Sequence, residues 1–178
     1  MYQRLSSILL ALFLMFSFTQ VQAASNAEIN AKSKQALKEF FKHSPAGREL
    51  YNRARGALIF PEVFKAGIGI GGEYGEGKLV EGGKTTGYYS IAAASIGFQL
   101  GAQVKTEIIL FMTDKALRQF KNSDGWEAGV DGSVALVTLG TGKEIDTSNI
   151  KDPIIGFIFS NKGLMYNLSL EGSKISKK

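Results

Sequence analysis

The 178-residue chain contains no cysteine, only one histidine and only three prolines. The absence of cysteine excludes disulfides, thiol nucleophiles and cysteine-ligated metal sites. A single histidine also removes most zinc sites and most histidine-dependent catalysis. We therefore expect a protein with no catalytic residues, no bound metal and no cofactor.

Long hydrophobic runs are also scarce, and the one that stands out lies at the N-terminus. Arg4 precedes an apolar run over residues 8–18, and the small-x-small pattern Val21-Gln22-Ala23 follows it. This arrangement is typical of a secretory signal peptide cut after Ala23. The alternative is a retained membrane helix, but a span needs roughly 20 apolar residues and this run is shorter. We expect residues 1–23 to direct export, and residues 24–178 to form one domain that is periplasmic or secreted and peripheral to a membrane.

Helical periodicity is confined mainly to the start of this domain. Residues 26–43 predict a helix with one apolar arc and one basic arc. The apolar arc consists of Ile29, Ala36, Leu37, Phe40 and Phe41, and the basic arc of Lys34, Lys38 and Lys42. Ser44-Pro45 is a typical helix start, so we expect a second helix from Pro45 to Arg55.

From Gly56 onward the pattern has the period of two that strands require. Apolar residues alternate over 96–104 and 164–171, which predicts strands buried on one face. The continuous apolar runs 108–112 and 154–159 predict strands buried on both faces. Turns are expected at Gly71-Gly72, Gly82-Gly83 and residues 140–142, and one short helix over residues 113–120. The order predicts an α+β fold in which amphipathic helices precede a curled, Gly-rich, mainly antiparallel sheet.

Two local motifs suggest enzymes but lack the context that each requires. Residues 67–72 match G-x-G-x-x-G as a string, yet no helix pattern and no suitably spaced acid follow. We expect these glycines in a bent strand and turn. Glu73 and Glu76 could form an acid–base pair, but solvated turn residues are the commoner outcome, and we expect that here.

Basic residues gather in the N-terminal part of the domain. Residues 24–55 hold seven basic and three acidic side chains, which accounts for the net +4 of residues 24–178. A cationic amphipathic helix of this kind suits an anionic membrane surface. The alternative is a surface helix whose Leu37–Phe41 face packs on the sheet while its lysines are merely solvated. We expect no nucleic-acid partner, because export and the lack of interleaved aromatics argue against one.

Four ordered segments resemble the SYLF lipid-binding domain family. They are residues 54–77 (ARGALIFPEVFKAGIGIGGEYGEG), 95–103 (SIGFQLGAQ), 129–134 (GVDGSV), and 159–164 (FSNKGL) with 170–173 (LEGS). The signal segment and residues 124–127 (DGWE) resemble exported bacterial members in particular. The resemblance implies a single lipid-binding domain without catalytic activity, whose eukaryotic relatives bind phosphoinositides and, in some fungi, actin.

The resemblance also implies where lipid would bind. The family's membrane contact is attributed to a basic amphipathic N-terminal part, which corresponds by position to residues 26–55. An exported bacterial protein meets neither phosphoinositides nor actin, so we expect anionic phospholipid as the partner. The candidate lipid-binding residues are Lys34, Lys38, Lys42, Arg48, Arg53, Arg55, Phe40 and Phe41. The alternative function is a structural or interaction protein of the cell envelope, bound to a protein partner through a sheet edge.

Overall fold

The computed structural model describes residues 23–139, 151–159, 170 and 172–178, so the signal segment lies outside the described residues except for Ala23. The described helices are α2 (Asn26–His43), α3 (Pro45–Arg53) and α4 (Asp114–Asn122). The described strands are β1 (Gly56–Glu81), β2 (Lys84–Phe111), β3 (Trp126–Glu127), β4 (Ala135–Thr138), β5 (Ile154–Phe159) and β6 (Lys174–Lys177). The predicted α+β class is confirmed, as is the short helix near Asp114.

Serine side chains begin the first two helices. The Ser25 hydroxyl accepts the backbone N–H of Glu28 at 3.2 Å, and the Ser44 hydroxyl accepts that of Gly47 at 2.9 Å. Pro45 then occupies the first turn of α3. The predicted range of α2 is confirmed. The second helix ends at Arg53 and not at Arg55, because Ala54 adopts an extended conformation that leads into β1.

A very long hairpin forms most of the sheet. β1 and β2 pair antiparallel from Gly56 opposite Phe111 to Glu81 opposite Lys84, and the predicted turn at Gly82-Gly83 is confirmed. Both glycines have positive φ angles, 55° and 78°, which favour glycine. The predicted turn at Gly71-Gly72 is wrong, because β1 continues through both residues. The predicted turn at 140–142 and most of the predicted strand 164–171 lie outside the described residues.

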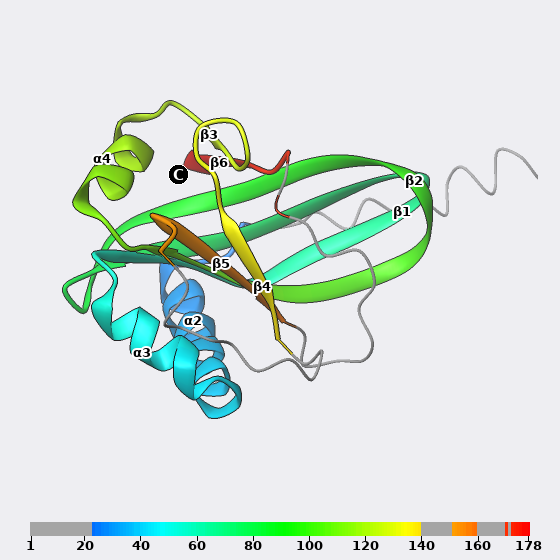
Figure 1. Ribbon diagram of the computed structural model, residues 1–178. Coiled ribbons are helices and arrows are strands. Elements are labelled where there is room, and N and C mark those ends of the chain that lie inside the picture. Colours follow the sequence, from blue (N-terminus) through cyan, green and yellow to red (C-terminus); the bar gives the residue numbers. More distant parts are fainter. Residues whose placement is uncertain (1–22, 140–150, 160–169, 171) are drawn as a thin grey trace, which may run out of the picture.

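The hairpin bends back on itself, so the sheet curls (Figure 1). β6 pairs with the first part of β2, over Tyr89–Ala92, and β5 with its last part, over Thr106–Phe111. The two halves of β1 then lie against each other. A Cβ atom at Gly75 would lie 2.8 Å from the Glu62 carbonyl oxygen, and one at Gly77 would collide with the Ile59 backbone.

The strand order of the six-stranded described sheet is β3-β6-β2-β5-β4, with β1 paired to β2. Its pairs are antiparallel except for β4 with β5, so the predicted mainly antiparallel sheet is confirmed. The curl encloses one apolar cluster that includes Leu58, Phe60, Ile109, Phe111 and Trp126. α2 and α3 cover a second cluster on the outer face, which includes Phe40, Leu50, Ile108, Ile155 and Phe157.

Burial along β2 differs between its two parts. Residues 108–111 and all of β5 are buried on both faces, as predicted. The predicted burial of Ala102 and Val104 is wrong, since both side chains are exposed. The physical reason is that β5 pairs with β2 only from Thr106 onward, and the outer cluster under α2 and α3 includes β2 residues only beyond that point.

Candidate functional site

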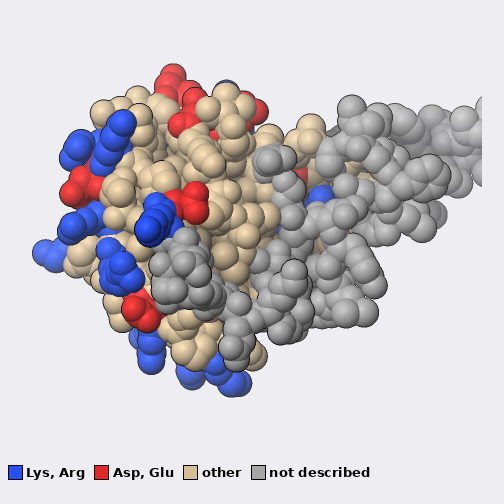
Figure 2. Space-filling view, in the orientation of Figure 1, with Lys and Arg blue, Asp and Glu red and all other residues tan. Residues whose placement is uncertain are grey.

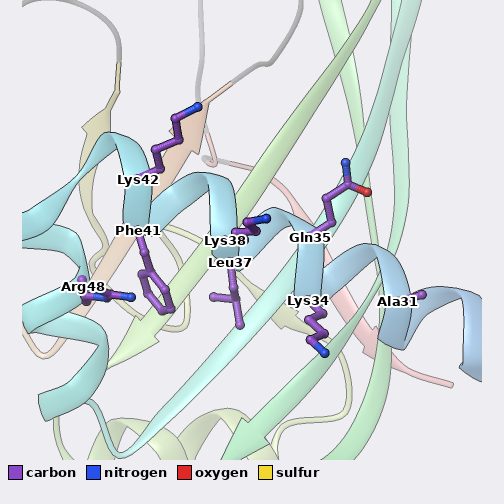
Figure 3. A pocket seen from close by; sticks show the side chains of 8 residues that line it. All are labelled: Ala31, Lys34, Gln35, Leu37, Lys38, Phe41, Lys42 and Arg48. Carbon is purple, nitrogen blue, oxygen red and sulfur yellow. The ribbon is translucent and has the colours of Figure 1, made fainter.

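Basic side chains of α2 and α3 surround an open hollow on the surface of α2. The hollow has a volume of about 740 Å³ and is lined by Ala31, Lys34, Gln35, Leu37, Lys38, Phe41, Lys42 and Arg48. We call these eight residues the α2 surface. Figure 3 shows Leu37 and Phe41 extending to one side of the helix with Lys34 near them, while Lys42 projects to the opposite side. Basic groups therefore lie on both sides of the hollow, with the apolar Leu37 and Phe41 on one of them.

The three lysines of the α2 surface carry positive charge that no acid of the described residues neutralises. Lys34, Lys38 and Lys42 are exposed, and none of them forms an ion pair within the described chain. Lys32 provides the contrast, because its amine lies 2.7 Å from carboxylate oxygens of both Glu28 and Glu62. In Figure 2, basic atoms show along the lower edge of the molecule, where α2 and α3 meet in Figure 1. Unneutralised cations on one side produce a local positive potential.

The Phe41 ring forms the apolar part of the hollow next to α3. The Arg48 guanidinium lies 5.0 Å from the centre of this ring, a cation–π contact visible in Figure 3. The Tyr51 ring meets Phe41 edge-on at a centroid distance of 5.1 Å. These contacts hold Phe41 half-buried, so part of its ring faces solvent beside the lysines.

Phe40 does not lie at the surface. Its side chain is completely buried, with its ring centroid 4.8 Å from that of Phe157 and 6.0 Å from that of Phe159 on β5. The prediction that Phe40 offers apolar surface to lipid is therefore wrong in this fold, because α2 packs on the sheet through this residue. Phe40 anchors α2 and thereby fixes the direction in which Lys34, Lys38 and Lys42 point.

Arg53 and Arg55 do not line the hollow. The Arg53 guanidinium lies 3.8 Å from a carboxylate oxygen of Glu49, and that of Arg55 lies 3.8 Å from Asp114. Both side chains are exposed. The structure thus groups four of the six predicted basic residues, Lys34, Lys38, Lys42 and Arg48, with Phe41, and leaves the two arginines outside this group.

A buried charged cluster lies inside the curled sheet, and the sequence patterns did not predict it. The Lys105 amine lies 2.8 Å from a carboxylate oxygen of Glu73 and 2.6 Å from one of Glu107. Glu73 also accepts the Ser173 hydroxyl at 3.1 Å. Glu73 pairs with Ala93 in one half of the bent hairpin, whereas Lys105 pairs with Val63 in the other half. The cluster therefore links the two halves of the sheet.

The expectation that Glu73 and Glu76 are solvated turn residues is wrong. Both are buried within β1, because the strand continues where a turn was expected. The alternation of residues along β2 could have predicted that its charged side chains Lys105 and Glu107 are buried. Lys105 and Glu107 share the strand face of Ile109 and Phe111, and this face forms the core.

Burial and mutual attraction act in opposite directions on the pKa values of this cluster. Loss of water raises the pKa of Glu107 to about 7, although the neighbouring Lys105 ammonium partly offsets this. Burial alone would lower the pKa of Lys105, but the charges of Glu107 and Glu73 outweigh it and raise the pKa. Lys105 therefore stays cationic at neutral pH while Glu107 titrates near it.

The described residues contain no group of three or more His, Cys, Asp or Glu side chains placed to hold a metal ion. No described helix is both long and apolar enough to cross a lipid bilayer.

Comparison with known proteins supports the family resemblance. A family model described as Ysc84, a Las17-binding protein actin regulator, matches residues 92–178. This match supports the resemblance to the SYLF family that the sequence motifs predict. The chain is also 27% identical over 126 residues to SH3 domain-containing YSC84-like protein 1 of Xenopus laevis, an alignment that covers 68% of the chain and 37% of the relative. The similarity to the Ysc84 family supports a binding role for this chain.

Proposed function

We propose that this chain docks on anionic phospholipid through the α2 surface. The observation that carries the proposal is the group of three exposed lysines, without acidic partners in the described chain, beside the half-buried Leu37 and Phe41. Lipid phosphates supply the missing negative charge, and the headgroup boundary accepts partly apolar side chains. The lipid-binding character implied by the SYLF resemblance supports the same interpretation.

The geometry favours shallow docking in which charge dominates. Phe40 is buried in the core, so the large apolar side chains of the hollow are Leu37 and Phe41. A basic residue near an anionic membrane contributes about 1 kcal/mol at physiological ionic strength. Exposed charges are screened over about 8–10 Å in physiological salt. We therefore expect binding that increases with the anionic fraction of the membrane and weakens strongly as salt rises.

Co-sedimentation with vesicles of rising phosphatidylglycerol content tests this proposal. The Lys34→Gln/Lys38→Gln/Lys42→Gln variant should bind at least about tenfold more weakly than the unmodified protein at low salt. A matched control, Lys115→Gln/Arg118→Gln/Lys177→Gln, removes the same charge from exposed residues of α4 and β6. Near-normal binding of this control supports docking through α2, whereas equal losses in both variants would contradict it.

The proposed setting is the cell envelope. The N-terminal signal pattern supports export, and a peripheral protein exposed to the periplasm or to the outside of the cell meets anionic lipid surfaces. Recovery of the protein from the periplasmic fraction of a bacterial host tests this, and retention in the cytoplasm would contradict it.

A protein partner at a sheet edge is the second candidate, favoured by one structural observation and by the family description. β4 ends the order of the described sheet, and Leu136 in this strand is 40% exposed. The family model is described as Las17-binding, so recognition of a protein segment by this chain is a reasonable second proposal. Leu136→Lys should then abolish capture of the partner while vesicle binding stays unchanged.

A further inference from the structure

Glu76 binds the backbone of Ala24, just before α2. Its carboxylate accepts the backbone N–H of Ala24 at 2.6 Å, the Lys178 ammonium at 2.6 Å and the Tyr74 hydroxyl at 3.0 Å. The Glu76 side chain is only 7% exposed. The Lys178 amine also lies 3.5 Å from the Ala24 carbonyl oxygen. A buried carboxylate thus joins residue 24, the strand β1 and residue 178.

Ala24 is the residue that follows the predicted signal-peptide cleavage after Ala23. We propose that cleavage of the Ala23–Ala24 peptide bond creates an α-ammonium group at Ala24, and that Glu76 is the built-in receptor for this new terminus. The step is a hydrolysis by a processing peptidase of the export pathway. Water supplies a hydroxyl to the Ala23 carbonyl and a proton to the Ala24 nitrogen, which takes a second proton from solvent.

The chemistry at Glu76 changes in a definite way on cleavage. Before it, a neutral amide donates to the carboxylate; after it, a cation occupies the same place, and charge-assisted hydrogen bonds are about twice as strong as neutral ones. Burial alone would raise the pKa of Glu76, but the hydrogen bonds from Lys178, Ala24 and Tyr74 lower it. The Glu76 carboxyl group is therefore ionised at neutral pH, and its negative charge attracts the new α-ammonium group.

Docking of the terminus also positions the α2 surface. Ala24 immediately precedes Ser25, which caps α2, so a fixed Ala24 fixes the first turn of this helix. Further along, Lys32 bridges to Glu62 at 2.7 Å and the Asn30 amide donates to the Tyr88 hydroxyl at 2.8 Å. Cleavage thus completes a set of contacts that seat the N-terminal half of α2 on the hairpin.

Two measurements test the proposal. First, the full chain is expressed in a secreting bacterial host, and its intact mass should show a terminus at Ala24. Second, residues 24–178, which contain all the described helices, strands and ion pairs, are prepared with a free or an acetylated Ala24 amine. In each form, Glu76 is kept or replaced by Gln. Acetylation should lower the Tm by roughly 3–8 °C when Glu76 is present and by little in Glu76→Gln.

A carboxylate elsewhere on the hairpin provides the control. Glu81 pairs with Lys121 at 2.9 Å and accepts the Thr86 hydroxyl at 2.6 Å, whereas Ala24 bonds to Glu76 and Lys178. Glu81→Gln should lower the Tm equally in the free and acetylated forms. Mature protein that begins elsewhere than Ala24, or acetylation that has the same effect with and without Glu76, would overturn the proposal.

Discussion

Glu107 carries an acidic side chain in a fully buried environment. It is fully buried on β2, opposite Phe60 of β1 in the pairing register, and the Lys105 amine lies 2.6 Å from one of its carboxylate oxygens. Two carboxylates, Glu73 and Glu107, share this single ammonium group. Burial away from water is the main cause of the raised pKa of Glu107, the Glu73 charge adds to it, and the Lys105 ammonium opposes it.

This environment predicts a pH-dependent stability. The pKa of Glu107 is about 7 in the fold against an ordinary value near 4.5, so the folded state binds the proton more tightly than the unfolded chain. The stabilisation is complete below about pH 4.5 and is lost as the pH rises through 7. Urea unfolding measures the free energy of unfolding at each pH. Between pH 5 and 8, this free energy should fall by about 2–3 kcal/mol more in the original protein than in Glu107→Gln. Exposed Glu49→Gln serves as the control, and parallel pH profiles for all three proteins would refute this role of Glu107.

At the scale of elements, the two halves of β1 approach so closely that side chains are excluded between them. Gly77 faces the Ile59 backbone and Gly75 faces Glu62 and Val63. These glycines are needed for space and not for a positive φ angle, since neither has one. The curl of the sheet, and with it the enclosed core, depends on this contact.

A pair of glycine substitutions in β1 tests the close approach. Gly77→Ala places a methyl group into the Ile59 backbone and should cost about 2–4 kcal/mol of unfolding free energy. Gly72→Ala lies in the same strand, where a Cβ would meet only the Ala93 carbonyl oxygen at an ordinary 3.5 Å. Its effect should stay within about 1 kcal/mol of zero. Comparable losses from the two variants, measured by denaturant unfolding, would show that the approach of the β1 halves is not the constraint.

The helices and strands differ in how well their bounds can be predicted from the sequence. α2 was predictable to the residue because Ser25, Ser44 and Pro45 are local signals that act within one helical turn. The continuity of β1 through Gly71-Gly72 was not, because a glycine pair is compatible with both a turn and a bent strand. Only the pairing with Ser95 and Ala94 on β2 decides between the two, and such pairing is remote in sequence.

For the whole molecule, the same distinction between local and remote signals applies to the candidate site. The spacing of Lys34, Lys38 and Lys42 by four predicts one basic face without any knowledge of the sheet. The sequence pattern could not predict which of Phe40 and Phe41 is buried, because the two residues are neighbours on one apolar arc. The position of β5 decides that Phe40 enters the core while Phe41 remains at the surface.

The packing of α2 also gives the molecule two distinct sides. α2 and α3 cover the outer cluster of the sheet, whereas Leu117 and Phe120 of α4 belong to the enclosed cluster. In Figure 1, α4 and the α2–α3 pair lie at different sides of the curled sheet. A membrane that contacts the α2 surface therefore leaves α4 in solvent.

Site-specific labelling tests this orientation most directly. Because the chain contains no cysteine, a thiol-reactive label attaches only at a cysteine introduced for the purpose. Gln35→Cys in the hollow and Gln119→Cys on exposed α4 would each carry a polarity-sensitive fluorophore. On vesicles rich in phosphatidylglycerol, docking through the α2 surface should produce a blue shift from the label at residue 35, reversed by high salt, and no shift at residue 119. A shift at residue 119 alone, or equal shifts at both positions, would contradict docking through the α2 surface.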